Sequence, residues 1–192
     1  MKSRFNLAFL FILFNLSLYS QESKESGWVN LEDDMTVTLK FTNTDISKSI
    51  NGFTFKAVWQ EALDLPNEEY AYGGISELHV YKGQTHIQTI KNIVDYIALG
   101  YVHLTFFDYN MDGYLDFTVP ISCGRSCYDK YYLYNPKTKI FTHQKEWDYL
   151  RIKDFNKAKK QVRSVPDGNV ADTKHFLYRV EELRLVKLKT IE

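Results

Sequence analysis

The sequence predicts an all-β protein, and three observations support that prediction. Short runs in which apolar and polar residues alternate recur along the chain, and a period of two is typical of half-buried strands. Turn-forming residues separate these runs at several points. Aromatic residues make up 16% of the chain, which suits sheets that pack face on face. These patterns leave open a sandwich, a barrel or an irregular propeller, and no internal repeat is visible from which a repeat architecture could be argued.

Residues 1–20 have the features of a secretory signal peptide. Lys2 and Arg4 give a short positive start, and residues 7–14 form an unbroken apolar run before the chain becomes polar. That run is too short to span a bilayer, and no second candidate span follows it. We therefore expect cleavage near Ser20 and a mature protein in the periplasm or outside the cell.

The mature chain of about 172 residues has the length of one domain. Residues 21–34 are mostly polar and acidic, and we expect them to form a flexible lead-in to a single domain of residues 35–192. The chain has 24 basic and 24 acidic residues, and two of the basic ones lie in the signal peptide. A balance so close to neutral gives no indication of nucleic acid or an anionic membrane as the partner.

The expected strands follow one another along the whole domain. They cover residues 35–42, 53–59, 75–81, 86–90, 102–107, 115–119, 131–134 and 139–142. The turn Asn51-Gly52 precedes the second, Lys82-Gly83-Gln84 separates the third from the fourth, and Asn135-Pro136-Lys137-Thr138 separates the last two. Two such runs around a short turn are typical of a β-hairpin. Residues 176–188 fit a long strand or a helix, and their final alternation favours a strand. Residues 59–65 and 147–160 are two possible helices, although neither shows a sustained helical stripe.

The segment from Asp108 to Asp116 has the spacing of a calcium-binding loop. Its candidate ligands are the side chains of Asp108, Asn110, Asp112 and Asp116 and the backbone carbonyl of Tyr114. Oxygen-bearing side chains at alternate positions let a tight loop wrap one hard cation, and Gly113 permits the sharp turn in the middle. Position twelve is Val119, so Asp116 at position nine has to supply the closing carboxylate.

The alternative for this segment is an Asp-Gly hairpin turn with incidental carboxylates. Three acidic side chains and an asparagine stand within nine residues, and the carboxylates repel one another without a cation. This repulsion favours Ca²⁺ as a cofactor.

Cys123 and Cys127 are the only cysteines in the chain. An even pair in an oxidising compartment favours a disulfide. The bridge would close a very small ring, so its effect would be local to one loop. A pair of metal ligands is the alternative, but no histidine or further cysteine lies close in sequence.

Part of the chain carries a recognisable order of segments. Four segments follow one another in this order: residues 107–116 with the calcium loop, the aromatic run 131–141, Leu150, and residues 160–164. From about Ile75 to the C-terminus, the chain resembles a family of periplasmic proteins related to the immunity protein of a Xanthomonas antibacterial type IV secretion effector. The resemblance implies a small β-propeller without sequence repeats, a calcium site in a strand-connecting loop, and inhibition of a lysozyme-like enzyme that cleaves peptidoglycan.

The loop between the two cysteines is the candidate partner-binding surface, with Arg125 at its tip and Tyr128 just after it. An arginine can form a bidentate pair with a carboxylate, and lysozyme-type glycosidases work with catalytic carboxylates. The alternative is that Arg125 is a solvated surface charge.

We expect a monomeric binding protein without catalytic activity. The chain has no nucleophile elbow, no zinc-binding His-Glu-x-x-His and no glycine-rich phosphate loop. Its five histidines are scattered, and the acidic cluster of residues 61–69 is more typical of a solvated loop than of a catalytic pair.

An alternative function is a carbohydrate- or surface-binding module that stacks sugars on Tyr70, Tyr72 and Tyr128.

Overall fold

The computed structural model describes residues 27–30, 36–40, 49–59, 75–91, 93, 101–123, 127–165 and 175–191. Every regular element in these ranges is a β-strand, so the all-β prediction is confirmed. The strands are β1 (Trp28–Asn30), β2 (Thr36–Lys40), β3 (Ser49–Ile50), β4 (Phe53–Trp59), β5 (Ile75–Lys82), β6 (Thr85–Lys91), β7 (Tyr101–Phe107), β8 (Asp116–Cys123), β9 (Cys127–Asn135), β10 (Ile140–His143), β11 (Arg151–Asn156), β12 (Gln161–Val165), β13 (His175–Glu181) and β14 (Arg184–Ile191).

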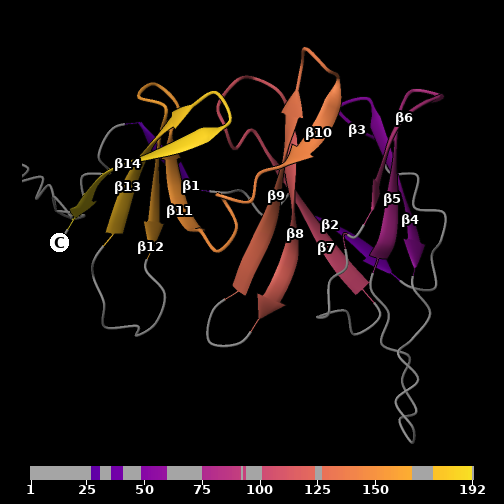
Figure 1. Cartoon of the computed structure of the whole chain (residues 1–192), viewed down its shortest axis with the longest axis horizontal. Helices are drawn as coiled ribbons and strands as arrows, with labels where there is room; N and C mark the ends of the chain where they lie inside the picture. Colours follow the sequence, from indigo (N-terminus) through magenta and orange to yellow (C-terminus); the bar gives the residue numbers. More distant parts are fainter. Residues whose placement is uncertain are drawn as a thin grey trace, which may run out of the picture.

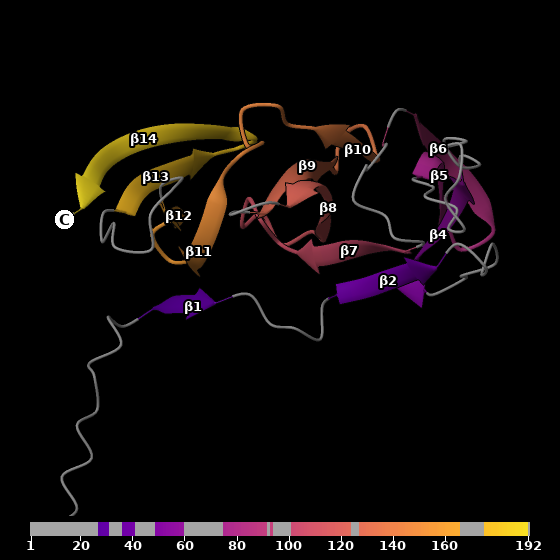
Figure 2. The same ribbon diagram turned by 90° about the horizontal axis from the view of Figure 1, so that it is seen from below.

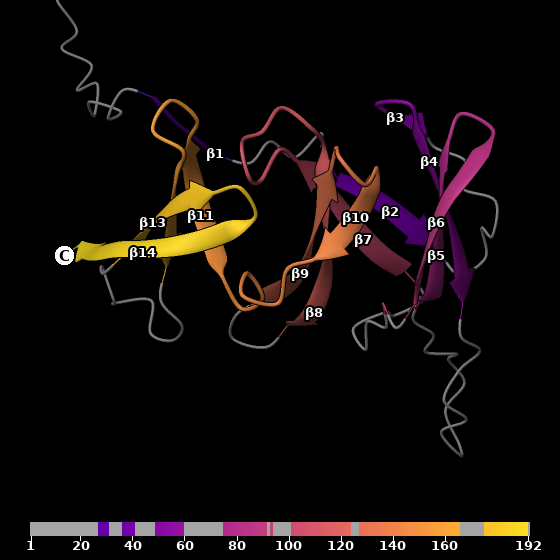
Figure 3. The ribbon, with the colours of Figure 1, turned by 45° about the horizontal axis from the view of Figure 1, so that its top comes forward.

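The strands form three antiparallel sheets. The strand orders are β3-β4-β5-β6 (the N-terminal sheet), β10-β9-β8-β7-β2 (the central sheet) and β1-β11-β12-β13-β14 (the C-terminal sheet). Figures 1, 2 and 3 show the three sheets side by side, with the central sheet between the other two. None of them closes into a barrel within the described residues. The arrangement is sandwich-like, which matches one of the architectures left open and differs from the propeller that the resemblance implied.

The central sheet is buried on both faces, and β9 shows this most directly. Tyr132 and Tyr134 belong to the core cluster shared with the N-terminal sheet, whereas Tyr131 and Leu133 belong to the cluster shared with the C-terminal sheet. Successive side chains of a strand point to opposite faces. A strand covered on both faces is therefore apolar or aromatic at every position, which explains the run Tyr131-Tyr-Leu-Tyr134.

The predicted hairpins are confirmed where the structure describes them. β5 pairs with β6, and β9 pairs with β10. Asn51 and Gly52 both have a positive φ, at 50° and 79°, between β3 and β4. Two left-handed residues in a two-residue loop match the right-handed twist of the flanking strands.

Residues 147–160 do not form a helix. They contain a turn that ends at Tyr149, strand β11, and a second turn over residues 157–160. Trp147 and Phe155 fill the same core from these two segments, so their burial depends on tertiary packing rather than on a helical face. Of the other possible helix, Trp59 ends β4 and residues 60–65 lie outside the described residues.

Two further predictions are corrected by the pairing of the C-terminal sheet. Residues 176–188 are neither one long strand nor a helix, because β13 and β14 form a hairpin with a turn at Glu182 and Leu183. Trp28–Asn30, which fall within the expected lead-in, form β1 and pair with β11.

The expected signal peptide lies outside the described residues. In the part of the chain that is described, no helix is long and apolar enough to cross a membrane.

Candidate calcium site and partner-binding surface

The candidate calcium loop joins β7 to β8 at one end of the central sheet. The two strands are antiparallel neighbours, and Phe107 stands opposite Asp116 where the loop begins and ends. Val119, at position twelve, is fully buried in the core. Its place in β8 explains why position twelve supplies no ligand in this loop.

The first part of the loop folds around its own polar side chains. The carboxylate of Asp108 accepts hydrogen bonds from the backbone N–H groups of Asp112 at 2.9 Å and Gly113 at 3.2 Å. The carboxylate of Asp112 accepts one from the backbone N–H of Tyr114 at 2.9 Å and one from the amide of Asn110 at 3.0 Å. Gly113 has a φ of 90°, which only glycine adopts without strain. The turn expected at this position is therefore present.

Asp116 is fully buried and is held by three backbone donors. Its carboxylate accepts hydrogen bonds from the N–H groups of Tyr109 at 2.9 Å, Asn110 at 3.3 Å and Tyr134 at 2.7 Å. The first two donors belong to the loop and the third belongs to β9. One carboxylate therefore fixes the start of the loop against the end of β9.

Burial disfavours the ionised forms of Asp116 and Asp108. Burial raises the pKa of Asp116 to about 8, the N–H groups of Tyr134 and Asn110 act in the opposite direction, and the nearby carboxylates of Asp112 and Asp108 raise it further. Burial also raises the pKa of Asp108, whereas Lys157, with its Nζ 3.7 Å from Asp108 Oδ2, lowers it. A bound divalent cation would offset the burial and the repulsion and keep these carboxylates ionised.

The donor set of the loop fits a hard cation in its chemistry. Each carboxylate oxygen has about two acceptor sites, so an oxygen such as Asp116 Oδ1, which accepts the N–H of Tyr134, keeps capacity for a metal. Calcium takes oxygen ligands from carboxylates, amides and backbone carbonyls. Within the described residues, no three His, Cys, Asp or Glu side chains already form a group that could hold a metal. Binding would therefore require the loop side chains to close around the ion.

A cavity of about 750 Å³ borders the same loop. Its lining includes Asp108 and Tyr114 of the loop, Lys157 of the turn after β11, and Val29 and Asn30 of β1. Solvent and ions therefore have a route to Asp108 at position one of the loop.

The two predicted sites lie at opposite ends of β8. β8 begins at Asp116 and ends at Cys123, a length of about 23 Å for an extended strand. Figure 1 shows β8 running from the loop to the far end of the central sheet. Arg125 lies outside the described residues. Calcium would therefore act on the far end of the hairpin only through the strand itself.

Cys123 and Cys127 stand directly opposite each other where β8 pairs with β9. Opposed residues of an antiparallel pair have Cα atoms about 4.5–5.5 Å apart, which is within the range that a disulfide spans. Their side chains lie outside the described residues, so the disulfide stays a prediction with a favourable backbone geometry.

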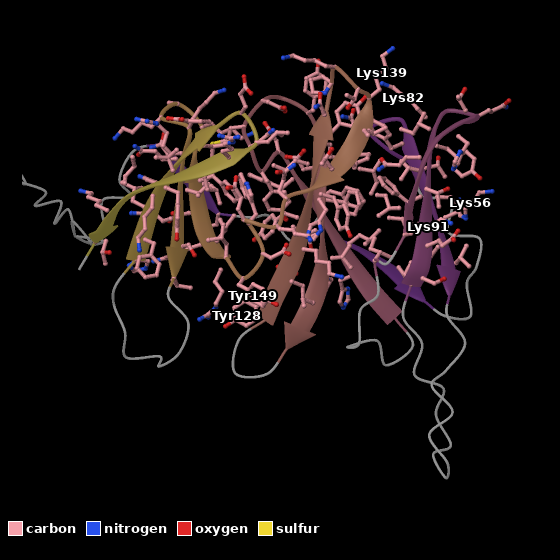
Figure 4. All side chains as sticks on the ribbon, viewed as in Figure 1. Lys56, Lys82, Lys91, Tyr128, Lys139 and Tyr149 are labelled. Atoms are coloured by element: carbon pink, nitrogen blue, oxygen red, sulfur yellow. The ribbon has the colours of Figure 1, made fainter. Side chains whose placement is uncertain are left out.

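An exposed tyrosine that the sequence did not reveal lies beside this end of the hairpin. The rings of Tyr149 and Tyr128 have centroids 5.3 Å apart in an edge-to-face arrangement (Figure 4). Tyr149 is 66% exposed and has a φ of 66°. The fully buried Trp147, whose indole N–H donates to the carbonyl of Leu183, anchors the same turn. The turn therefore presents a large aromatic side chain on a fixed backbone.

The structure describes only some of the other residues considered for function. Residues 61–69, Tyr70 and Tyr72 lie outside the described residues. The Nε2 of His143 donates to the carboxylate of Asp148 at 2.9 Å, and the imidazole ring stacks on Tyr132, which is a packed structural role. Comparisons of the chain with protein families, with curated proteins and with solved structures found no match.

Proposed function

We propose that this chain is a secreted, calcium-stabilised binding protein that inhibits a lysozyme-like peptidoglycan hydrolase. The observation that carries the proposal is the arrangement along β8. An acidic loop that contains the buried carboxylate of Asp116 lies at its start, and the aromatic pair of Tyr128 and the exposed Tyr149 lies beside its end. The first feature suits a structural cation, and the second suits contact with another molecule.

Calcium would have a structural role in this proposal. Its ligands would be the side chains of Asp108, Asn110, Asp112 and Asp116 and the carbonyl of Tyr114. The ion would neutralise Asp116, whose carboxylate already joins the loop to β9 through Tyr134. Sites of modest affinity are filled outside the cytoplasm, where calcium is abundant.

The partner-binding surface would consist of Tyr128, Tyr149 and the loop that carries Arg125. Tyrosine supplies a large contact area at a low cost in conformational entropy, and exposed aromatic anchors often dominate interface energies. A disulfide between Cys123 and Cys127 would order Arg125 before binding and so reduce the entropy lost in the complex. Arg125 would then pair with a catalytic carboxylate of the hydrolase.

The inhibitory role rests on the resemblance of residues 107–116 and 131–141 to the immunity-protein family. A carbohydrate-binding module is the second candidate, and the same tyrosine pair favours it. Aromatic rings bind the apolar faces of sugars, and Tyr149 leaves most of its surface free for such contact.

A binding experiment separates the two candidates. Mature protein is titrated calorimetrically with lysozyme-type hydrolases and, separately, with soluble peptidoglycan fragments. The inhibitor proposal predicts saturable one-to-one binding to an enzyme, weakened at least tenfold by Tyr149→Ala. Weak binding to glycan fragments alone, lost in the same variant, would favour the carbohydrate-binding module and contradict the inhibitor proposal.

A further inference from the structure

The β5–β6 hairpin places two histidines on one face of the N-terminal sheet. His79 in β5 stands opposite Thr89 in β6. Tyr81, which is two residues after His79 in β5, stands opposite His86 in β6. Residues two apart on a strand point to the same face, so His79 and His86 are diagonal neighbours. Their ring centroids are 5.7 Å apart.

The nitrogen atoms of the two rings converge on one oxygen atom. His79 Nδ1 lies 2.9 Å from Thr89 Oγ1, and His86 Nε2 lies 3.0 Å from the same oxygen. A hydroxyl group has one hydrogen and can satisfy only one acceptor nitrogen. The two imidazoles therefore direct one nitrogen each toward a common point near the hydroxyl of Thr89.

A carboxylate lies on the other side of the His79 ring, so Nδ1 is the nitrogen that would bind a metal. Glu77 Oε2 lies 3.5 Å from His79 Nε2, and Glu77 is itself paired with Lys91 at 3.4 Å. A histidine that binds a metal through one nitrogen commonly donates its other N–H to a carboxylate, which fixes the ring and its tautomer. Glu77 is placed to do this for His79.

We propose that His79 Nδ1 and His86 Nε2 form a binding site for a borderline transition-metal cation, with Zn²⁺ and Cu²⁺ as the expected ions. Imidazole nitrogen suits these ions, whereas the oxygen-rich loop at Asp108–Asp116 suits calcium. No third His, Cys, Asp or Glu of the described residues completes a ligand group here. The hydroxyl of Thr89 and water would fill the remaining positions, so the site is open to a ligand atom from another molecule.

Accessibility and packing agree with such a site. His86 is exposed and His79 is partly exposed, so a cation from solvent reaches both. The rings of Tyr81 and His86 pack edge to face, with centroids 5.2 Å apart, which limits the positions of that imidazole. To bind Zn²⁺, the two rings would rotate until both nitrogens lie about 2.0–2.1 Å from the ion.

The test uses mature protein without a histidine tag, already saturated with calcium. Zn²⁺ and Cu²⁺ are titrated calorimetrically, and the Cu²⁺ complex is examined by electron paramagnetic resonance for nitrogen ligands. We expect one ion per chain, two-nitrogen coupling, and affinity at least tenfold weaker in His79→Gln and in His86→Gln. Glu77→Gln should weaken binding by a smaller factor, because Glu77 positions a ligand and does not bind the metal.

His175→Gln is the matched control, because it removes an imidazole from the C-terminal sheet. Its affinity should equal that of the unmodified protein. Unchanged melting temperatures in calcium would show that the variants are folded. Equal affinity in both His79→Gln and His86→Gln, or the absence of saturable binding of either ion, would overturn the proposal.

Discussion

The carboxylate of Asp116 accepts a 2.7 Å hydrogen bond from the backbone N–H of Tyr134, which lies in a different strand. Two N–H groups of the loop, from Tyr109 and Asn110, donate to the other oxygen of the same carboxylate. The loop conformation and the position of β9 therefore depend on one buried acidic group. A cation bound to that group would stabilise the central sheet as well as the loop.

Asp112→Ala should abolish the rise in melting temperature that we expect calcium to produce in the unmodified protein. Asp112 is exposed, so the calcium-free stability should fall by only about 1 kcal/mol, as expected for a few lost hydrogen bonds. Thermal unfolding in calcium and in a chelator measures both effects. Glu181→Ala removes an exposed carboxylate outside the loop and should keep the full calcium response; a full response in Asp112→Ala would show that calcium binds elsewhere.

Asp116→Asn should destabilise the calcium-free protein by about 1–3 kcal/mol, because an amide NH₂ group would face backbone N–H donors. It should also remove the calcium response, since the closing carboxylate is lost. Urea unfolding at equilibrium, with and without calcium, gives both quantities. An unaltered calcium response would mean that Asp116 is only a structural acceptor.

The calcium-free protein should lose stability as the pH rises from about 4 to about 8. Burial raises the pKa of Asp116 to about 8 from an ordinary value of 3.8, so over this range the folded state holds a proton that the unfolded state has released. Folding is then favoured at the lower pH, and the contribution of this group declines until the folded pKa is passed. Melting temperatures measured from pH 5 to pH 9 in a chelator test this dependence.

Calcium should reverse that trend, because the ion and the proton compete for the same carboxylate. The calcium-dependent rise in melting temperature should therefore be small near pH 5 and large near pH 8. Asp116→Asn serves as the control and should show neither dependence. A calcium response of constant size across this pH range would contradict the role assigned to Asp116.

Tyr149→Gly should leave the stability unchanged or raise it by up to about 1 kcal/mol. The φ of 66° at Tyr149 is a left-handed conformation that glycine adopts without the penalty paid by other residues. The same variant should bind the target hydrolase at least tenfold more weakly. Loss of binding with a retained or higher melting temperature would indicate that Tyr149 is kept for function; unchanged binding would exclude it from the interface.

Gln88→Ala should lower the free energy of unfolding by about 1–3 kcal/mol. The side-chain amide of Gln88 in β6 donates to the carbonyl of Phe141 at 2.7 Å and accepts from its N–H at 2.8 Å. These two bonds join the N-terminal sheet to the edge of the central sheet, and the buried Phe141 would lose both. Urea unfolding measures the change, and Gln84→Ala in the exposed β5–β6 turn is the control; equal stabilities would show that packing alone joins the sheets.

Features that depend on a few neighbouring residues could be predicted from the sequence. Turn residues such as Asn51-Gly52 mark hairpins because their backbone preferences are local, and the loop of Asp108–Asp116 is recognisable by spacing alone. The possible helix at 147–160 was wrong because Trp147 and Phe155 are buried by strands far away in the sequence. β1 was missed because a three-residue strand has too short a pattern to be read without its partner β11.

The proposed binding surface could be predicted only in part. The loop between Cys123 and Cys127 stays a prediction, whereas Tyr149 was not predicted, since neither its positive φ nor its contact with Tyr128 leaves a local sequence signal. The pair His79 and His86 was treated as scattered. The predicted turn at 82–84 could have revealed the pair. The turn sets the pairing of β5 with β6, and that pairing makes the two histidines diagonal neighbours.

The most direct test is hydrolysis of peptidoglycan by lysozyme-type enzymes, measured with increasing amounts of the mature protein in calcium and then in a chelator. We predict dose-dependent inhibition at one-to-one stoichiometry in calcium, and weaker inhibition in the chelator as the loop around Asp116 loses its ion. Full enzyme activity across the tested hydrolases, at protein concentrations well above those of the enzymes, would contradict the account.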